Sequence, residues 1–77
     1  MFLEIITPDK KLFEGEVSSV TVPGKTGTFQ MLNRHAPVIS ALKKGKIKIK
    51  TSQGIQHFDV NGGVVEMQKN KIIVLAE

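Results

Sequence analysis

Hydrophobic and polar residues alternate along much of this chain with the two-residue period of a β-strand. The clearest case is Lys46–Lys50, where isoleucines are predicted to face a core and lysines to face water. Turn residues such as Pro8 divide the chain into short segments, at the spacing of a β-sandwich or barrel. The predicted strands are Phe2–Ile6, Leu12–Val22, Thr28–Leu32, Lys46–Lys50, Ile55–Val60, Val64–Gln68 and Ile72–Ala76.

Two segments leave room for alternatives, and a third has no polar position. Leu12–Val22 is long enough for one bent strand or two, with Gly15 as a natural bulge or kink. Its alternation slips by one residue near Ser18–Ser19, which itself indicates a bulge. Pro37–Lys44 is predicted as either a strand or a single helical turn. Ile72–Leu75 is apolar at every position, so we expect it to be buried on both faces between two sheets.

The composition is that of one small globular domain covering residues 1–77. A chain of 77 residues has no room for two hydrophobic cores, and 40% of the residues are apolar, which is enough for one. There is no cysteine, so disulfides and thiolate metal sites are excluded. No apolar run approaches the ~20 residues of a membrane-spanning helix. The sequence therefore predicts an all-β domain that is soluble or peripheral to a larger assembly.

Positive charge is concentrated in one part of the chain. The net charge is +4, and five of the eleven basic residues lie between Lys43 and Lys50. Such a stripe could meet an acidic protein, an anionic lipid surface or nucleic acid, or it could be a solvated strand face whose lysines prevent edge-to-edge pairing. A barrel that binds single-stranded nucleic acid is the alternative function, although such proteins stack bases on aromatic side chains. The four Phe residues are spread over four segments, which argues against it.

No catalytic, cofactor or metal site is predicted. Gly24-Lys25-Thr26 resembles part of a phosphate-binding loop, but position 19 is serine instead of the required glycine and a strand follows instead of a helix. His35 and His57 are the only imidazoles, and no acidic residue stands at a ligand spacing from them. Two interpretations of His35 stay open, a ring that hydrogen-bonds its own loop and a contact residue at an interface.

Several further motifs follow one another in one register along the chain. The central one is His35-Ala36-Pro37 followed by Val38–Leu42 and Lys43-Lys44-Gly45. The flanking motifs are Leu12–Val17, Val22-Pro23-Gly24 with Gly27, Asn61–Met67 and Ile73–Ala76. In their order and spacing, these motifs resemble the family of ATP synthase epsilon subunits. Two departures are Asn33-Arg34, where many relatives carry Pro-Gly, and Thr28, where relatives often carry an acidic residue. The resemblance runs from about Phe2 to Glu77.

The resemblance implies a flattened β-sandwich of two roughly five-stranded, mostly antiparallel sheets. It implies a non-catalytic rotor subunit that binds the gamma subunit and the membrane c-ring, transmits torque, and lies peripherally on the cytoplasmic face of the bacterial inner membrane. The implied gamma-subunit contacts are Thr7, His35 and Ser40. The implied c-ring contacts are Lys25, Thr26, Gly27 and Thr28. Many relatives continue into a helical hairpin that senses ATP; if these residues are the whole chain, we expect neither ATP binding nor hairpin-type inhibition.

Overall fold

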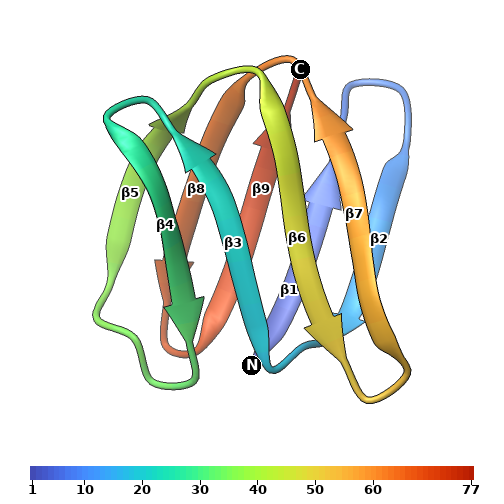
Figure 1. Ribbon diagram of the computed structural model, residues 1–77, viewed down its shortest axis with the longest axis vertical. Helices are drawn as coiled ribbons and strands as arrows, with labels where there is room; N and C mark the ends of the chain where they lie inside the picture. The colour runs from blue at the N-terminus through green and yellow to red at the C-terminus, as the bar shows by residue number, and fades with distance from the viewer.

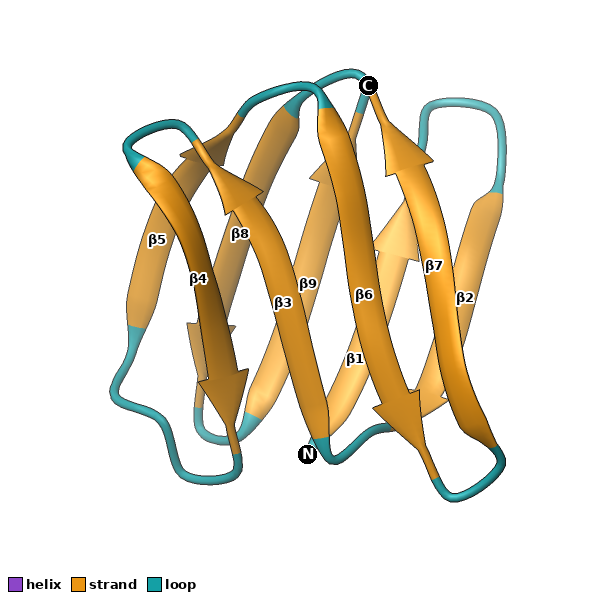
Figure 2. Ribbon diagram, in the orientation of Figure 1, coloured by secondary structure: helices purple, strands orange, loops and turns teal.

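The computed structural model describes residues 1–77 and consists of nine β-strands without a helix (Figure 2). Short connections separate the strands, and several contain residues such as Pro8, Asn61 and Gly62, which favour the tight backbone conformations of turns. The strands are β1 (Phe2–Ile6), β2 (Lys11–Glu16), β3 (Ser19–Gly24), β4 (Gly27–Leu32), β5 (Val38–Leu42), β6 (Gly45–Thr51), β7 (Gly54–Val60), β8 (Gly63–Gln68) and β9 (Lys71–Ala76).

The strands form one hydrogen-bonded sheet that folds back on itself into two layers. Its order is β2-β1-β9-β8-β5-β3-β6-β7, and β4 pairs with β3. We call β2-β1-β9-β8-β5 the back layer and β4-β3-β6-β7 the front layer, as they appear in Figure 1. Only the β1–β9 pairing is parallel. The predicted flattened, mostly antiparallel sandwich of two roughly five-stranded layers is therefore confirmed, with five and four strands.

The layers join where β3 meets β5. The only Cα pair between these strands is Gly24–Leu42, and two backbone bonds flank it, from Lys25 N to Ala41 O and from Lys43 N to Pro23 O, each 2.9 Å long. A Cβ atom at position 24 would lie 2.6 Å from the Gly27 carbonyl oxygen. The β3–β4 hairpin beside this corner therefore depends on glycine at position 24, because a larger residue would collide with the backbone of β4.

One hydrophobic core fills the space between the layers. Inward-facing residues alternate with outward-facing ones, so Ile47 and Ile49 are fully buried while the neighbouring lysines are exposed, as the alternation predicts. No polar or charged residue is buried. The core residues are Leu3, Ile5, Val17, Val20, Val22, Met31, Leu42, Ile47, Ile49, Val60, Val65, Met67, Ile72, Val74 and Ala76.

The segment Leu12–Val22 forms two strands, β2 and β3. The amide of Val17 donates to Met1 O in the back layer (2.9 Å), and the next amide, of Ser18, donates to Lys50 O in the front layer (2.8 Å). The slip in the alternation therefore marks the point where the chain changes layer. Gly15 does not form the expected bulge, because it lies in regular register opposite Leu3.

The structure decides between the two alternatives for one further segment and contradicts the expectations for two others. Pro37–Lys44 contains a strand, β5, and no helical turn. Ile72–Leu75 is not buried on both faces: Leu75 is 56% exposed, because β9 lies in an outer layer with only one face on the core. The lysines of Lys46–Lys50 do not protect a sheet edge, because β6 lies between β3 and β7.

A candidate protein-interaction face

The outer face of the back layer carries a row of apolar side chains that the core does not use. The strand registers place Ala41 of β5 beside Val64 of β8, Val64 beside Leu75 of β9, and Leu75 beside Ile6 of β1. We call these four residues the apolar row. Val64 is 42% and Leu75 56% exposed. Contiguous apolar side chains on the surface of a small protein mark interaction sites.

A second row, one residue pair further along the strands, mixes apolar and acidic side chains. Ile39 lies beside Glu66, Glu66 beside Ile73, and Ile73 beside Glu4. Ile39 is 73% exposed, the largest exposure among the large hydrophobic residues of the chain. The two rows together form what we call the back face. It combines an apolar strip with carboxylates, so it can bury aliphatic side chains and accept hydrogen bonds.

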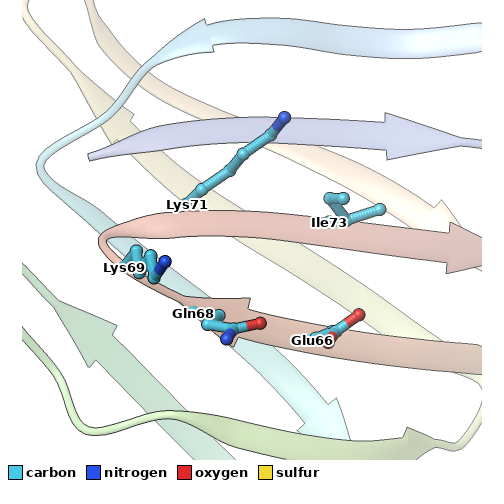
Figure 3. A pocket seen from close by; sticks show the side chains of 5 residues that line it. All are labelled: Glu66, Gln68, Lys69, Lys71 and Ile73. Carbon is cyan, nitrogen blue, oxygen red and sulfur yellow. The ribbon is translucent and has the colours of Figure 1, made fainter.

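Next to the back face, towards the β8–β9 turn, the outer surface of the back layer is polar and slightly hollow. Glu66, Gln68, Lys69, Lys71 and Ile73 line a shallow depression of about 340 Å³ over β8 and β9 (Figure 3). Lys71 reaches across β1, and its Nζ lies 5.9 Å from the centroid of the Phe2 ring. This cation–π contact holds the ammonium group against the sheet. The outer surface of the back layer thus runs from the apolar row to a basic end at Lys69 and Lys71.

Ion pairs organise the rim of the back face on β1 and β2. Lys11 Nζ lies 3.0 Å from the Glu14 carboxylate and 3.1 Å from the Glu4 carboxylate. Hydrogen bonds to Glu14 and then to Glu4 raise the pKa of the Lys11 ammonium above its ordinary value. The group is solvated, so its charge shapes the rim of the face more than the stability of the fold.

The three residues predicted to contact a gamma subunit are distributed over this layer. Thr7 lies just beyond Ile6 and lines a second hollow with Val64 and Leu75. Its Oγ1 donates to Lys10 O (2.9 Å) and accepts from Lys10 N (3.0 Å), which closes the turn after β1. Of the three predicted residues, Thr7 is thus the one that borders the apolar row.

Ser40 and His35 lie elsewhere on the layer. Ser40 is a half-buried residue of β5, and the strand alternation turns it away from the exposed Ile39 and Ala41. His35 is exposed in the loop between β4 and β5, at the end of the sandwich opposite the turn after β1 (Figure 1). One interpretation of His35 is a ring that hydrogen-bonds its own loop. The structure shows such a bond, because the ring Nδ1 lies 2.7 Å from Ala36 O. The structure therefore spreads these residues along the layer instead of clustering them.

The loop that carries His35 is tied to the β8–β9 turn. Arg34 N donates to Asn70 Oδ1 (2.9 Å), and Asn70 Nδ2 donates to Asn33 Oδ1 (2.7 Å). We call these contacts the Asn70 clamp. Arg34 and Asn70 both have positive φ, of 66° and 62°. Within the Asn33-Arg34 pair, the left-handed residue is therefore Arg34 and not Asn33.

The residues predicted to contact a c-ring form the tip of the β3–β4 hairpin. Lys25 and Thr26 are the two turn residues between the paired Gly24 and Gly27, and all four predicted residues are exposed. Lys25 N donates to Ala41 O, which fixes the tip to β5. The hairpin lies at the opposite end of the sandwich from the β4–β5 loop (Figure 1).

The apolar row is not predicted from the sequence. The apolar outer positions of Ile72–Leu75 belong to it, but their pattern predicts burial between two sheets. No group of His, Asp and Glu side chains comes together that could hold a metal ion. None of the segments forms a helix able to cross a membrane.

Comparison with known proteins identifies similar chains. The family model described as ATP synthase, Delta/Epsilon chain, beta-sandwich domain matches residues 1–77. The ATP synthase epsilon chain of Chlorobium limicola is 45% identical over 76 residues, which cover 97% of this chain and 86% of that protein. The epsilon chain of Caulobacter vibrioides is 34% identical over 77 residues, which cover 100% of this chain and 90% of the relative.

The fold also matches a chain in the solved structure of the Euglena gracilis mitochondrial ATP synthase, described as OSCP/F1/c-ring in rotational state 1. The TM-score is 0.88 at 17% sequence identity, so this likeness concerns the fold alone. The match covers 96% of this chain and 48% of the Euglena chain, so this chain spans about half the length of that neighbour.

Proposed function

Because this chain belongs to the family of ATP synthase delta/epsilon chain β-sandwich domains, we propose that it is a non-catalytic subunit of the central stalk of a proton-translocating ATP synthase. In this role it links the gamma subunit to the membrane c-ring and transmits the torque that couples proton flow to ATP synthesis. It lies peripherally on the cytoplasmic face of the bacterial inner membrane. The observation that carries the proposal, beside family membership, is the exposed apolar row of the back layer.

The gamma subunit is the proposed partner of the back face. Burying a fully exposed Leu or Val side chain contributes about 1.5–3 kcal/mol. Leu75 is 56% and Val64 42% exposed, so each can still contribute about half of that and serve as an anchor of the contact. Thr7 borders the row, whereas Ser40 lies on its outermost strand, β5, with the side chain turned away from the row. His35 extends the contact to the other end of the layer, so the interface follows the 26 Å long axis of the molecule.

The tip of the β3–β4 hairpin is the proposed contact with the c-ring. Lys25, Thr26, Gly27 and Thr28 are exposed, and the turn projects from one end of the sandwich (Figure 1). The corner at Gly24 and the bond from Lys25 N to Ala41 O hold the tip on the back layer. A short, anchored loop suits a contact that must move with a rotating ring, because it yields little under load.

The core of the sandwich supports a mechanical role. Its 15 buried residues are all apolar and pack between two layers that share one continuous hydrogen-bonded sheet. Such close-packed interiors have low compressibility and transmit strain. A load applied at the hairpin therefore reaches the back face through packed residues and backbone hydrogen bonds, without a hinge between them.

Co-expression with the gamma subunit from the same genome, followed by size-exclusion chromatography, tests this function. We expect the two chains to co-elute at one-to-one stoichiometry. Leu75→Asp should abolish co-elution, because it places a charge in the middle of the apolar row. Ile55→Asp is the matched control, since Ile55 is 52% exposed, close to the 56% of Leu75, and lies on the front layer.

Two results would count against the proposal. The first is separate elution of the folded chain and folded gamma subunit. The second is equal loss of co-elution in Leu75→Asp and Ile55→Asp, which would show that the back face has no special part in the contact. Circular dichroism of both variants separates a lost interface from a lost fold.

A further inference from the structure

The outer face of the front layer is basic, whereas four of the seven acidic residues lie on strands of the back layer, namely Glu4, Glu14, Glu16 and Glu66. Lys46, Lys48 and Lys50 all project outward from β6 and are exposed. Lys46 Nζ forms an ion pair with the Asp59 carboxylate at 2.8 Å, but Lys48 and Lys50 have no acidic partner. Lys48 instead lies beside His57 in the register. Two unpaired ammonium groups therefore stand side by side on a central strand.

Apolar side chains flank these lysines at one end of the sheet. The registers place Leu32, Ser19, Lys50 and Ile55 side by side across β4, β3, β6 and β7. Leu32 and Ile55 are each 52% exposed. With Lys48 they border a shallow hollow of about 260 Å³. This patch, which we call the front patch, offers positive charge between two aliphatic side chains.

We propose that the front patch is a docking site for an acidic protein segment in which carboxylates lie next to aliphatic side chains. Lys48 and Lys50 are two residues apart on one face of a strand, so their Cα atoms are about 6.6 Å apart, a separation that two neighbouring carboxylates can match. Leu32 and Ile55 bury the aliphatic groups of the partner. The hollow is smaller than the roughly 300–1,000 Å³ of small-molecule sites, and it fits side chains of a partner.

Nucleic acid is a poorer match for the front patch. Binding of single strands depends on aromatic side chains on which bases stack. Phe13, Phe29 and Phe58 pack against the core, and Phe2 belongs to the back layer. No aromatic side chain is therefore left for the front patch.

An anionic membrane surface is also a poorer match. A lysine near such a surface contributes about 1 kcal/mol, so the two unpaired lysines give only marginal binding. Leu32 and Ile55 stand on different strands with β3 and β6 between them, so they do not form a continuous strip that could enter a bilayer. A protein segment can meet the charges and both aliphatic side chains at once.

The docking site is distinct from the proposed gamma and c-ring contacts, and its test uses the isolated chain. The probe is a short synthetic peptide rich in Glu and Leu, titrated into the 15N-labelled protein and followed by amide chemical shifts. We expect the shifts to gather on β6 and on the adjoining parts of β3, β4 and β7. Replacing Leu by Ser in the peptide should weaken binding, because Leu32 and Ile55 then lose their partners.

Charge variants decide whether the front patch is the site. Lys48→Gln/Lys50→Gln should weaken peptide binding about three- to tenfold, as expected for two exposed charge pairs. Lys69→Gln/Lys71→Gln removes the same charge from the back layer and should leave binding within about twofold. Equal weakening by both pairs, or shifts centred on β8 and β9, would overturn the proposal. So would tighter binding to oligo-dT or to phosphatidylserine vesicles than to the peptide.

Discussion

Asn70 is expected to hold the β4–β5 loop in place through its side chain. Its amide joins two segments far apart in the sequence, because Oδ1 accepts from Arg34 N and Nδ2 donates to Asn33 Oδ1. Asn70 also has a φ of 62°, a conformation that Asn tolerates better than most residues. Substitution at this position therefore removes hydrogen bonds and, for residues other than Gly, adds backbone strain.

The two contributions can be separated by magnitude. Both hydrogen bonds are exposed, so each contributes about 0.5–1 kcal/mol, the lower part of the usual range. Asn70→Gly, which keeps the backbone unstrained, should therefore cost about 1–2 kcal/mol. Asn70→Ala loses the same bonds and adds about 1–2 kcal/mol for the left-handed conformation, for a total of about 2–4 kcal/mol. At about 4–8 °C per kcal/mol for a domain of this size, Asn70→Ala should lower the Tm by roughly 8–30 °C.

Urea unfolding followed by circular dichroism measures these free energies. The expected order of stability is wild type, then Asn70→Gly, then Asn70→Ala. Asn61→Ala is the control, because Asn61 lies in the β7–β8 turn, has no side-chain hydrogen bond and does not have positive φ. It should change stability by less than about 0.5 kcal/mol. If Asn70→Ala also changes the free energy of unfolding by less than about 0.5 kcal/mol, or is more stable than Asn70→Gly, the side chain of Asn70 does not hold the loop in place.

Three further predictions concern other positions. Arg34→Gly should stabilise the fold by about 0.5–1 kcal/mol in the same urea assay, because Arg34 has a φ of 66° that suits glycine. Gly24→Ala should destabilise it by about 1–3 kcal/mol through overpacking at the corner, whereas Gly15→Ala, whose Cβ would meet only a ring edge at 3.4 Å, should cost less. Lys46→Gln should raise the pKa of the Asp59 carboxyl, measured by NMR titration, because the hydrogen bond from Lys46 holds that pKa below its ordinary value. The ion pair contributes fully to the free energy of unfolding above the unfolded-state pKa of Asp59, and this contribution is lost as the pH falls through the folded-state pKa. Lys46→Gln should therefore make the free energy of unfolding less dependent on pH in this acid range.

The strands could be predicted from the sequence because the alternation of apolar and polar residues within each strand shows which side chains face the core. Phe2–Ile6 has the predicted bounds, and Lys46–Lys50 shows the predicted alternation of buried and exposed residues. The break between β2 and β3 was harder to predict from the sequence. Alternation shows that a side chain faces a core, but it does not show which of two layers the backbone belongs to, and at Val17 and Ser18 that layer changes.

The back face could not be predicted because it depends on lateral neighbours. Ala41, Val64, Leu75 and Ile6 come from four strands, and they align only through the registers and through the parallel pairing of β1 with β9. No local pattern encodes that pairing, since it joins the two ends of the chain. The contact residues implied by family resemblance remain proposals, and only Thr7 lies beside the apolar row.

The two proposed contacts with the stalk and the ring converge on the back layer. The apolar row belongs to that layer, the Asn70 clamp ties the His35 loop to its β8–β9 turn, and the bond from Lys25 N to Ala41 O ties the hairpin tip to its β5 strand. A load that enters at Lys25 and leaves at Leu75 thus crosses backbone hydrogen bonds of β5, β8 and β9 and does not need the outer side chains of β6 and β7. Under the proposed function, removing the charges of Lys48 and Lys50 should therefore leave assembly with gamma unchanged, because the proposed gamma and c-ring contacts use the back layer and leave the front patch free for a separate partner.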